Sequence, residues 1–449
     1  MDSTLMRCFP AERVKVREFP RVGSYVLSKL DLKTWIWLAV WLSTRALIVA
    51  GVAFWATPHA GLEDVNHYER WSHVLSGEHA FPNVETWQYP PGAGLLMLLP
   101  RLISVGYGGA FVALMLLVDL AGLVLLARLG RRSGNDTGVW VWLLGIPLLG
   151  SVSVLRFDLV PTVIAIAALL VIHRRPGWFG ALAGLGAAIK LWPLLLLFGE
   201  WDRRLLLRSV VVATAVTALV LAVSAIAFDG ATNFVSHGGD RGLQEEAVAT
   251  IPWQLAQIVS GDPYPREIRS GAWEIATPTA DSVATLLRWL TFAALAAAAV
   301  WWWFRSRAIR AGCEQLAKAA VSRDFIFTVV MLVVVTSPVL SAQYMVWLLG
   351  LAAVVLSAGS TRLRRPAWIV VGATMLSAAT FKSPELTLLR DLVLLCATVD
   401  AAAAMVQLLT RRWTGGPLQE LESTSLEPHL APEPFFADLE PPQETRKPA

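Results

Sequence analysis

Long apolar stretches separated by short polar segments run along most of this chain. They recur from Trp35 to Met405, and many are long enough to cross the roughly 30 Å hydrocarbon core of a membrane. Charged residues gather at the ends of these stretches in small, mainly basic clusters. The pattern predicts an all-α integral membrane protein whose membrane part, residues 35–410, is one domain.

The basic clusters predict how the chain crosses the membrane, because positive residues favour the cytoplasmic ends of spans. They are Arg128-Arg131-Arg132, His173-Arg174-Arg175, Arg203-Arg204-Arg208, Arg305-Arg307-Arg310, Arg362-Arg364-Arg365 and Arg411-Arg412. Placing all of them inside, together with the basic N-terminal segment, requires about twelve spans with both termini cytoplasmic. The predicted spans are 35–57, 109–128, 138–154, 157–173, 178–189, 191–202, 206–228, 282–304, 322–338, 342–358, 366–381 and 388–409.

Two of these segments, on either side of Lys190, are too short for straight crossings. Lys190 and Pro193 interrupt them, which predicts a broken or re-entrant helix pair buried in protein. Gly180, Gly184 and Ala188 recur at four-residue spacing, so this region should pack closely against another helix.

The composition limits what lies outside the membrane. The chain is 55% hydrophobic and 16% charged, which leaves no room for a large soluble domain. Residues 1–34 form a basic cytoplasmic segment, and 411–449 a disordered cytoplasmic tail rich in Pro and Glu. The three cysteines predict neither a disulfide framework nor a zinc site. The net charge of +4 fits membrane orientation, so no nucleic-acid partner is expected.

The first outer loop, about residues 57–103, contains the charged segment "GLEDVNHYERW" (61–71). Apolar residues at helical spacing predict a short amphipathic helix from Asp64 to about Gly77, with Asp64 as its N-cap. "PPGAGLLMLLPRL" predicts a second helix, started by Pro90 and Pro91 and lying on the membrane surface. Asp64 is either only a helix cap or a functional carboxylate.

Further polar segments fall on the same, outer side of the predicted topology. They are "WQYPPG" (87–92), "LRFDLVP" (155–161), Lys190, "SHGGDRGLQEEAV" (236–248), "SPVLSAQY" (337–344) and "FKSPEL" (381–386). Ionisable groups near a bilayer are costly unless they pair or act, so this one-sided collection predicts a site facing the outer compartment.

Each of these segments also has a purely structural interpretation. Arg156 and Asp158 can simply pair with one another, and the charges of the large outer loop, about 229–281, can be solvated surface. Lys190 has no role in orientation at the outer end of a broken helix, which favours a ligand role. Aromatic residues such as Trp71 and Trp87 can stack on sugars, but the interfacial belt is the commoner explanation. Arginine is the side chain best suited to grip a phosphate.

The ordered set of motifs resembles glycosyltransferase family 87 of the GT-C superfamily. Asp64 in a long first outer loop is followed by "YPPGAGLLMLLP", "FDLVPTVIAIAALL", "AAIKLWPLLLL", "RGLQEEAV" and "SPVLSAQYMVW". The likeness covers roughly residues 35–410. It implies a GT-C membrane enzyme that moves a sugar, with mannose as the family default, from a polyprenyl-phosphate donor to a lipid-linked or glycan acceptor at the outer (periplasmic) face of the plasma membrane.

The resemblance also implies residue roles. Asp64 matches the family's first-loop aspartate and would be the catalytic base. Some members carry a His-His pair where this chain has Gln343 and Tyr344, so a metal or acid–base role of that pair is not supported here. No cofactor is predicted, and a divalent metal is left open.

The chemistry of such a transfer selects further candidates. Displacing a phosphate from a sugar C1 needs a base for the acceptor hydroxyl and positive charge for the leaving group. A single base with direct attack predicts inversion at the anomeric centre. Candidates for the donor phosphate are Arg241, Lys190 and His237, and candidates for other substrate contacts are His67, Tyr89, Arg156, Asp158, Gln244, Glu245, Gln343 and Tyr344.

Two other classes of protein fit parts of the pattern. A secondary transporter would also have many spans and a broken helix, but it should show charges near the midplane and two similar halves. A flippase for cell-envelope lipids would share the one-sided basic site without needing Asp64. The sequence does not identify the sugar, the acceptor or the linkage.

Overall fold

The computed structural model describes most of the apolar part of the chain. The described residues are 31–55, 62–84, 86–104, 106–237, 241–269, 271–310, 315–358, 361–377 and 383–410. Nearly all of them belong to the first of two compact units, Met1–Met405; the second, Val406–Ala449, begins within the last helix. The predicted tail 411–449 and residues 1–30 of the predicted basic segment lie outside the described residues.

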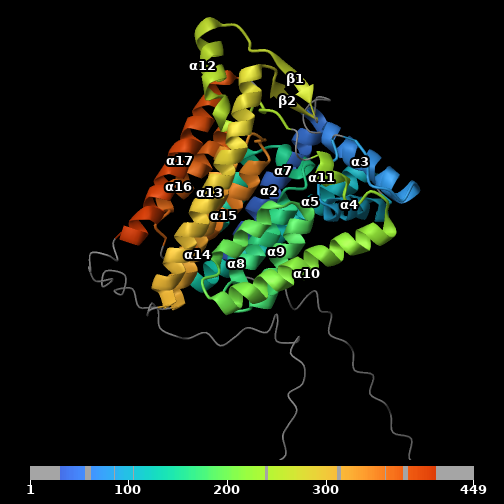
Figure 1. Cartoon of the computed structure of the whole chain (residues 1–449). Helices are drawn as coiled ribbons and strands as arrows, with labels where there is room; N and C mark the ends of the chain where they lie inside the picture. The colour runs from blue at the N-terminus through green and yellow to red at the C-terminus, as the bar shows by residue number, and fades with distance from the viewer. Residues whose placement is uncertain are drawn as a thin grey trace, which may run out of the picture. The chain divides into compact units, whose positions relative to one another are not determined.

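Helices make up most of the described chain (Figure 1). The α-helices are α2 (Leu32–Trp55), α3 (Leu62–Gly77), α4 (Pro91–Leu98), α5 (Tyr107–Ser133), α6 (Thr137–Leu148), α7 (Val152–Leu155), α8 (Leu159–Val171), α9 (Pro176–Ile189), α10 (Arg203–Ala227), α11 (Asn233–His237), α12 (Ile251–Ser260), α13 (Pro278–Arg310), α14 (Gln315–Thr336), α15 (Tyr344–Ser357), α16 (Arg364–Ser377) and α17 (Pro384–Thr410). The 3-10 helices are η1 (Leu99–Leu102), η2 (Trp192–Gly199) and η3 (Val248–Thr250).

Six helices in the described ranges are long and apolar enough to cross a membrane, namely α2, α5, α10, α13, α14 and α17. The helices α6, α8, α9 and α15 are also apolar but have only 10–17 residues. All of these, together with η2 and α16, overlap the predicted spans. The chain is therefore a helical membrane protein. The count of about twelve crossings remains a prediction, because a short helix need not cross the bilayer.

One small sheet departs from the predicted all-α fold. Strand β1 (Arg266–Arg269) pairs antiparallel with β2 (Ala272–Ile275), and Arg269 lies opposite Ala272 in the register. Gly271 in the connecting turn has a φ of 78°, a conformation that glycine adopts without steric cost. The strands have four residues each, too short for a clear alternating pattern in the sequence.

The predicted break beside Lys190 is present. Helix α9 ends at Ile189, Lys190 is extended, and η2 begins at Trp192 with Pro193 in its first turn. The small residues before the break pack closely, as predicted. A Cβ on Gly180 or Gly184 would lie 2.3 or 2.4 Å from a backbone oxygen of α10.

The two short helices of the first loop are present, and α3 differs from the prediction at its start. Helix α3 begins at Leu62, so Asp64 lies in its first turn and is not the N-cap. Helix α4 begins at Pro91, as predicted, but most of its residues are buried, and it packs against α3, α9 and α10. A Cβ on Gly92 would lie 2.5 Å from the carbonyl oxygen of Ala188. Close packing within the protein therefore holds α4 on several sides, and its place on the membrane surface stays a prediction.

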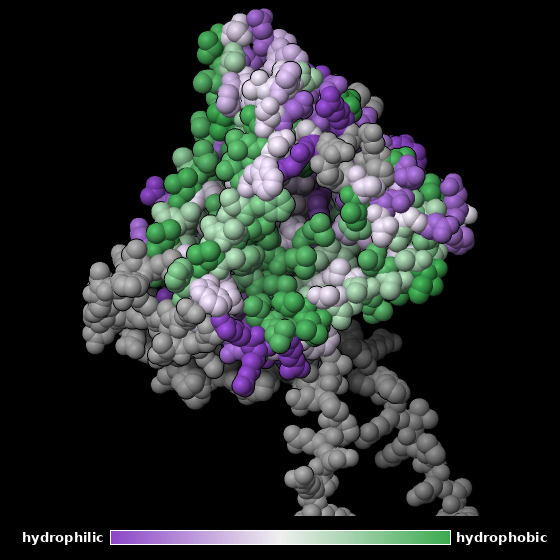
Figure 2. Space-filling model, in the orientation of Figure 1, coloured by the Kyte–Doolittle hydropathy of each residue, from purple (hydrophilic) through white to green (hydrophobic). Residues whose placement is uncertain are grey.

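Residues of two predicted inner clusters form polar contacts with other segments. Arg131, at the end of α5, donates to Thr34 at the start of α2, with Nη2 2.5 Å from Oγ1. His173 after α8 contacts both Glu200 (2.8 Å) and Ser322 of α14 (2.7 Å). In Figure 2 a broad hydrophobic band crosses the visible face, with hydrophilic side chains above and below it.

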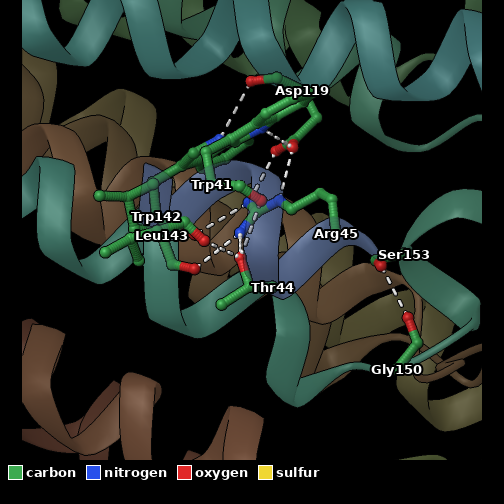
Figure 3. A network of polar contacts seen from close by, with 9 residues as sticks. Trp41, Thr44, Arg45, Asp119, Trp142, Leu143, Gly150 and Ser153 are labelled. Atoms are coloured by element: carbon green, nitrogen blue, oxygen red, sulfur yellow. Dashed lines mark hydrogen bonds and ion pairs between the residues drawn. The ribbon is translucent and has the colours of Figure 1, made fainter. Parts of the chain in front are cut away.

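A buried ion pair ties α2 to α5 in the interior of the bundle (Figure 3). Arg45 Nε lies 2.7 Å from Asp119 Oδ2, and both side chains are almost completely buried. Arg45 also donates to the carbonyl oxygens of Leu143 and Trp142, and the Trp41 indole N–H donates to Asp119. The pair thus joins α2, α5 and α6 where no water can replace a lost partner.

We predict that Asp119→Asn destabilises the protein strongly. Removing one partner leaves the Arg45 charge buried and unpaired, which costs about 3–5 kcal/mol. Thermal unfolding in detergent should show a clearly lower Tm. Glu267→Gln is the matched control, because its pair with Arg269 is half-exposed and should contribute little. A wild-type Tm for Asp119→Asn would contradict this interpretation.

Candidate active site

Asp64 and Arg156 form an ion pair. Val65, next to Asp64, lies beside Gly108 at the start of α5, whereas the predicted inner residues Arg131 and Arg132 lie at the end of that helix. Asp64 comes from the first turn of α3, and Arg156 is the extended residue that follows α7. Their side chains are 23% and 26% exposed, so the pair is partly shielded yet reachable from outside. Because α7 is only one turn long, the chain changes direction there and directs Arg156 towards α3.

A second ion pair lies beside the first. Lys190 Nζ is 2.6 Å from Asp158 Oδ1, and the Trp347 indole N–H donates to the same oxygen over 2.7 Å. Asp158 is 3% exposed and Lys190 12%. Arg156 and Asp158 thus each pair with a residue from another segment. The interpretation that they simply pair with one another is wrong, because residues two apart at the start of α8 point in different directions.

Aromatic rings surround the Lys190 ammonium group. Its Nζ lies 4.8 to 5.8 Å from the ring centroids of Trp347, Tyr344, Phe157 and Tyr89. Tyr344 stacks on Trp347 with centroids 4.0 Å apart, and Trp192 stacks on the other side at 5.3 Å. Desolvated rings attract a cation through their negative faces, so this cage, together with Asp158, fixes the position of Lys190.

The remaining wall of the site comes from α3. Asp64, His67 and Trp71 share one border of its buried face, because residues three, four and seven apart lie on the same side of a helix. His67 and Trp71 have ring centroids 5.7 Å apart, and Trp71 packs edge-on against Trp87. Trp87 is completely buried, so it serves neither as a sugar platform nor as part of an interfacial belt.

Burial shifts the pKa of two side chains on α3. It raises the pKa of Asp64, against the opposing effect of the Arg156 charge. It lowers the pKa of His67, as does the nearby charge of Arg70. A carboxylate with a raised pKa is a better proton acceptor than an ordinary aspartate, provided that it is ionised.

The loop from Arg241 to Thr250 contacts the segment that leads into α15 and also contacts α17. The backbone N–H of Gln244 donates to the carbonyl oxygen of Pro338 over 3.0 Å. Glu246 is anchored by Arg390 of α17, whose Nη2 donates to its carbonyl oxygen over 2.6 Å. Arg390 also pairs with Asp391, and both side chains are completely buried.

The other predicted site residues are distributed as follows. Gln244 is buried, and its backbone N–H donates to Pro338. Glu245 pairs with Arg266 of the hairpin at 2.7 Å, away from the cage. Gln343 is buried at the N-cap position of α15, directly before Tyr344. The side chain of His237 lies outside the described residues. The described ranges contain no group of three or more metal-ligating side chains of His, Cys, Asp or Glu.

Several buried polar residues were not among the predicted site residues. They are Arg45, Asp119, Glu246, Trp347, Arg390 and Asp391. The charged residues inside helices could have been noticed in the sequence, because a charge within an apolar stretch must find a partner. Arg390 and Asp391 stand together in such a stretch. They pair with each other, and their further partners Glu246 and Gln254 come from a distant segment, which the spacing could not show.

The comparison with protein families identifies the chain. The model of glycosyltransferase family 87 matches residues 87–322, more than half of the sequence. The chain belongs to this family. A member of the family is a glycosyltransferase and uses a donor and an acceptor substrate. No curated protein and no solved structure gave a significant match.

The family match covers one side of the site. Tyr89, Arg156, Asp158, Lys190 and the Arg241–Thr250 loop lie within it, whereas Asp64 and Tyr344 lie outside. The candidate site therefore combines cations and aromatics from the matched region with residues of α3 and of the start of α15. Figure 2 shows a hollow above the middle of the visible face, with hydrophilic atoms in its depth.

We predict energetic coupling between Lys190 and Asp158. Lys190→Met and Asp158→Asn should each lower stability, and the double variant should lose less than the sum of the two by about 0.5–3 kcal/mol, as for contacting residues. Chemical unfolding in detergent measures this cycle. The more exposed pair Arg266–Glu245 is the control and should show little coupling. Additive effects at Lys190 and Asp158 would argue against the pair.

Proposed function

We propose that this glycosyltransferase moves a sugar from a polyprenyl-phosphate donor to a hydroxyl of a lipid-linked or glycan acceptor. Mannose is the sugar expected from the family resemblance, and Asp64 is the base. The observation that carries the proposal is the Asp64–Arg156 ion pair beside the caged Lys190, because it sets a proton acceptor next to two cations.

Asp64 has the properties that the base requires. It is partly exposed, and burial raises the pKa of its carboxyl group, so its ionised form accepts a proton readily. An acceptor hydroxyl within hydrogen-bond reach would lose its proton to Asp64 as the oxygen attacks C1 of the donor sugar. Attack from the side opposite the phosphate inverts the anomeric configuration.

Arg156, Lys190 and Arg241 are the candidates for holding the phosphate. The leaving group departs as a stable anion, so it needs positive charge rather than an acid. A guanidinium group can grip a phosphate with two parallel hydrogen bonds. Donor phosphate would compete with the Asp64 carboxylate for Arg156, and its binding would release Asp64 to meet the acceptor. His237 stays a candidate for the same role.

The rest of the site would bind the sugar and the acceptor. His67 and Trp71 stand on the Asp64 side, where the acceptor must lie, and Tyr89 and Tyr344 form part of the cage next to the phosphate candidates. Gln244 and Gln343 are buried beside the loop and the start of α15, respectively.

The position of the site supports catalysis at the outer face of the plasma membrane. The basic segment around Arg131 lies at the end of α5, away from its start beside α3, and such segments favour the cytoplasm. A base beyond the apolar band can meet a phosphate headgroup whose polyprenyl chain remains in the bilayer.

We predict that Asp64→Asn lowers sugar transfer by about 10²–10⁴-fold, the usual contribution of a general base. Asparagine keeps the shape but cannot take a proton. Transfer by purified protein in liposomes, from polyprenyl-phosphate mannose to a lipid extract, measures this, and donor binding should persist. Glu63→Gln, an exposed neighbour on α3, is the matched control and should keep most activity. Equal transfer by Asp64→Asn and wild type would show that the base lies elsewhere.

We also predict that Arg156→Gln shifts the acid limb of the pH profile. The base must be ionised, so kcat/KM rises with pH through the pKa of Asp64 in the free enzyme. Arg156 lowers that pKa, and removing its charge raises it. The acid limb should therefore move to higher pH in the variant. Arg266→Gln, on the hairpin, should leave the limb in place, and an unmoved limb in Arg156→Gln would contradict the role of the pair.

A further inference from the structure

Arg323, near the start of α14, carries a charge that no acidic group of the described chain neutralises by an ion pair. Its Nε is inaccessible to solvent and has no hydrogen-bond partner among the described residues. The residue as a whole is partly exposed, so the outer part of its side chain can be reached from solvent. A guanidinium group that loses water without gaining an acceptor costs free energy. An anion from outside the chain would supply that acceptor.

A hydrogen bond on one side of Arg323 brings a second arginine close to it. Ser322 Oγ lies 2.7 Å from His173 Nε2, in the segment that follows α8. Arg174 comes directly after His173, and its side chain is exposed. Consecutive Cα atoms are only about 3.8 Å apart, so both arginines start one residue away from this contact. Their long side chains can therefore reach the same ligand.

Asp324, on the other side of Arg323, holds a third segment in place. Its Oδ1 accepts from Thr361 Oγ1 over 2.7 Å, and its Oδ2 accepts from the backbone N–H of Arg362 over 3.0 Å. Asp324 is 3% exposed and both of its oxygens are engaged, so its carboxylate does not face an incoming anion. The Arg362 side chain is exposed. Three separate segments thus place arginines around residues 322–324.

The position of Arg323 along α14 indicates which kind of anion it meets. The part of α14 that is long and apolar enough to span a membrane runs from Ala319 to Thr336, so Arg323 lies near one end of a span. Arginines at such ends reach the level of the lipid headgroups, and basic pockets between membrane helices bind headgroup phosphates. Membrane orientation alone does not require the partial burial of Arg323, because an exposed arginine serves that purpose equally well.

We propose that Arg323, together with Arg174 and Arg362, binds the phosphate group of an anionic phospholipid. A guanidinium group can hold a phosphate through two parallel hydrogen bonds, which would give Arg323 the acceptor it lacks. The two exposed arginines add positive charge around the same group. This lipid site does not rest on the proposed function, because it uses none of the residues of the candidate active site.

Binding of short-chain lipids to the purified full-length protein in detergent tests the proposal. Native mass spectrometry gives a Kd for dioctanoyl phosphatidylglycerol, for dioctanoyl phosphatidylcholine and for inorganic phosphate. The wild type should bind phosphatidylglycerol most tightly. In Arg323→Gln its Kd should rise about tenfold to a hundredfold, as expected for the loss of a hydrogen bond between charged groups. Arg174→Gln changes an exposed side chain, so it should fold normally and weaken binding by a smaller factor.

Arg132→Gln is the matched control, because Arg132 is an exposed arginine of another predicted inner cluster, at the end of α5. It should keep the wild-type Kd. Equal weakening in Arg132→Gln and in the Arg323 or Arg174 variants would show only a general attraction between charges and would overturn the site. Unchanged binding in Arg323→Gln would overturn it as well. If phosphatidylcholine or inorganic phosphate binds as tightly as phosphatidylglycerol, an anionic lipid is not the ligand.

Discussion

Pairing of buried charges is the constraint on which this structure depends. An ionised side chain between apolar helices has no water to stabilise it, so an opposite charge must come from elsewhere in the chain. Arg45 and Asp119 meet this need between α2 and α5, and Arg390 and Asp391 meet it where α17 supports the Arg241–Thr250 loop. The Arg45–Asp119 pair joins two distant segments directly, whereas Arg390 and Asp391 do so through their hydrogen bonds with Glu246 and Gln254.

At the candidate site the same constraint brings the charges together. Asp64–Arg156 and Lys190–Asp158 are assembled from three segments, and neither pair is bulk solvated. An incoming phosphate can replace a carboxylate as the partner of a cation, so that the cation stays paired. In the proposed reaction this exchange frees the base when the donor is bound, and the aromatic cage keeps Lys190 in place meanwhile. In the proposed reaction, the charges that pair with one another in the free enzyme thus also serve as the base and as the cations that bind phosphate.

The helices could be predicted from the sequence because they depend on local patterns. Apolar length located the long helices, Pro91 marked the start of α4, and Lys190 marked the end of α9. The family could also be recognised, because its motifs are ordered along the chain. The contacts of α4 could not be predicted, since a dozen apolar residues do not show which segments they pack against. The close approach of Gly92 to Ala188 is seen only in the fold.

The ion pairs within the candidate site could not be predicted from the sequence for the same reason. Arg156 and Asp158 are neighbours, and only the short helix α7 and the approach of α3 show that each pairs elsewhere. Gln244 and Glu245 were chosen as site candidates, whereas Glu246 was not. Nothing in "RGLQEEAV" shows that Glu245 pairs with the hairpin while the Glu246 side chain turns inward. These outcomes depend on contacts between distant segments.

The most direct test of the central claim is the stereochemistry of the transferred sugar. Purified wild-type protein in liposomes would be supplied with polyprenyl-phosphate mannose of known anomeric configuration and an acceptor lipid extract, and the product linkage would be determined by NMR. Attack by an acceptor hydroxyl activated at Asp64 predicts a product with the inverted configuration. A product that retains the donor configuration would contradict direct displacement with Asp64 as the single base.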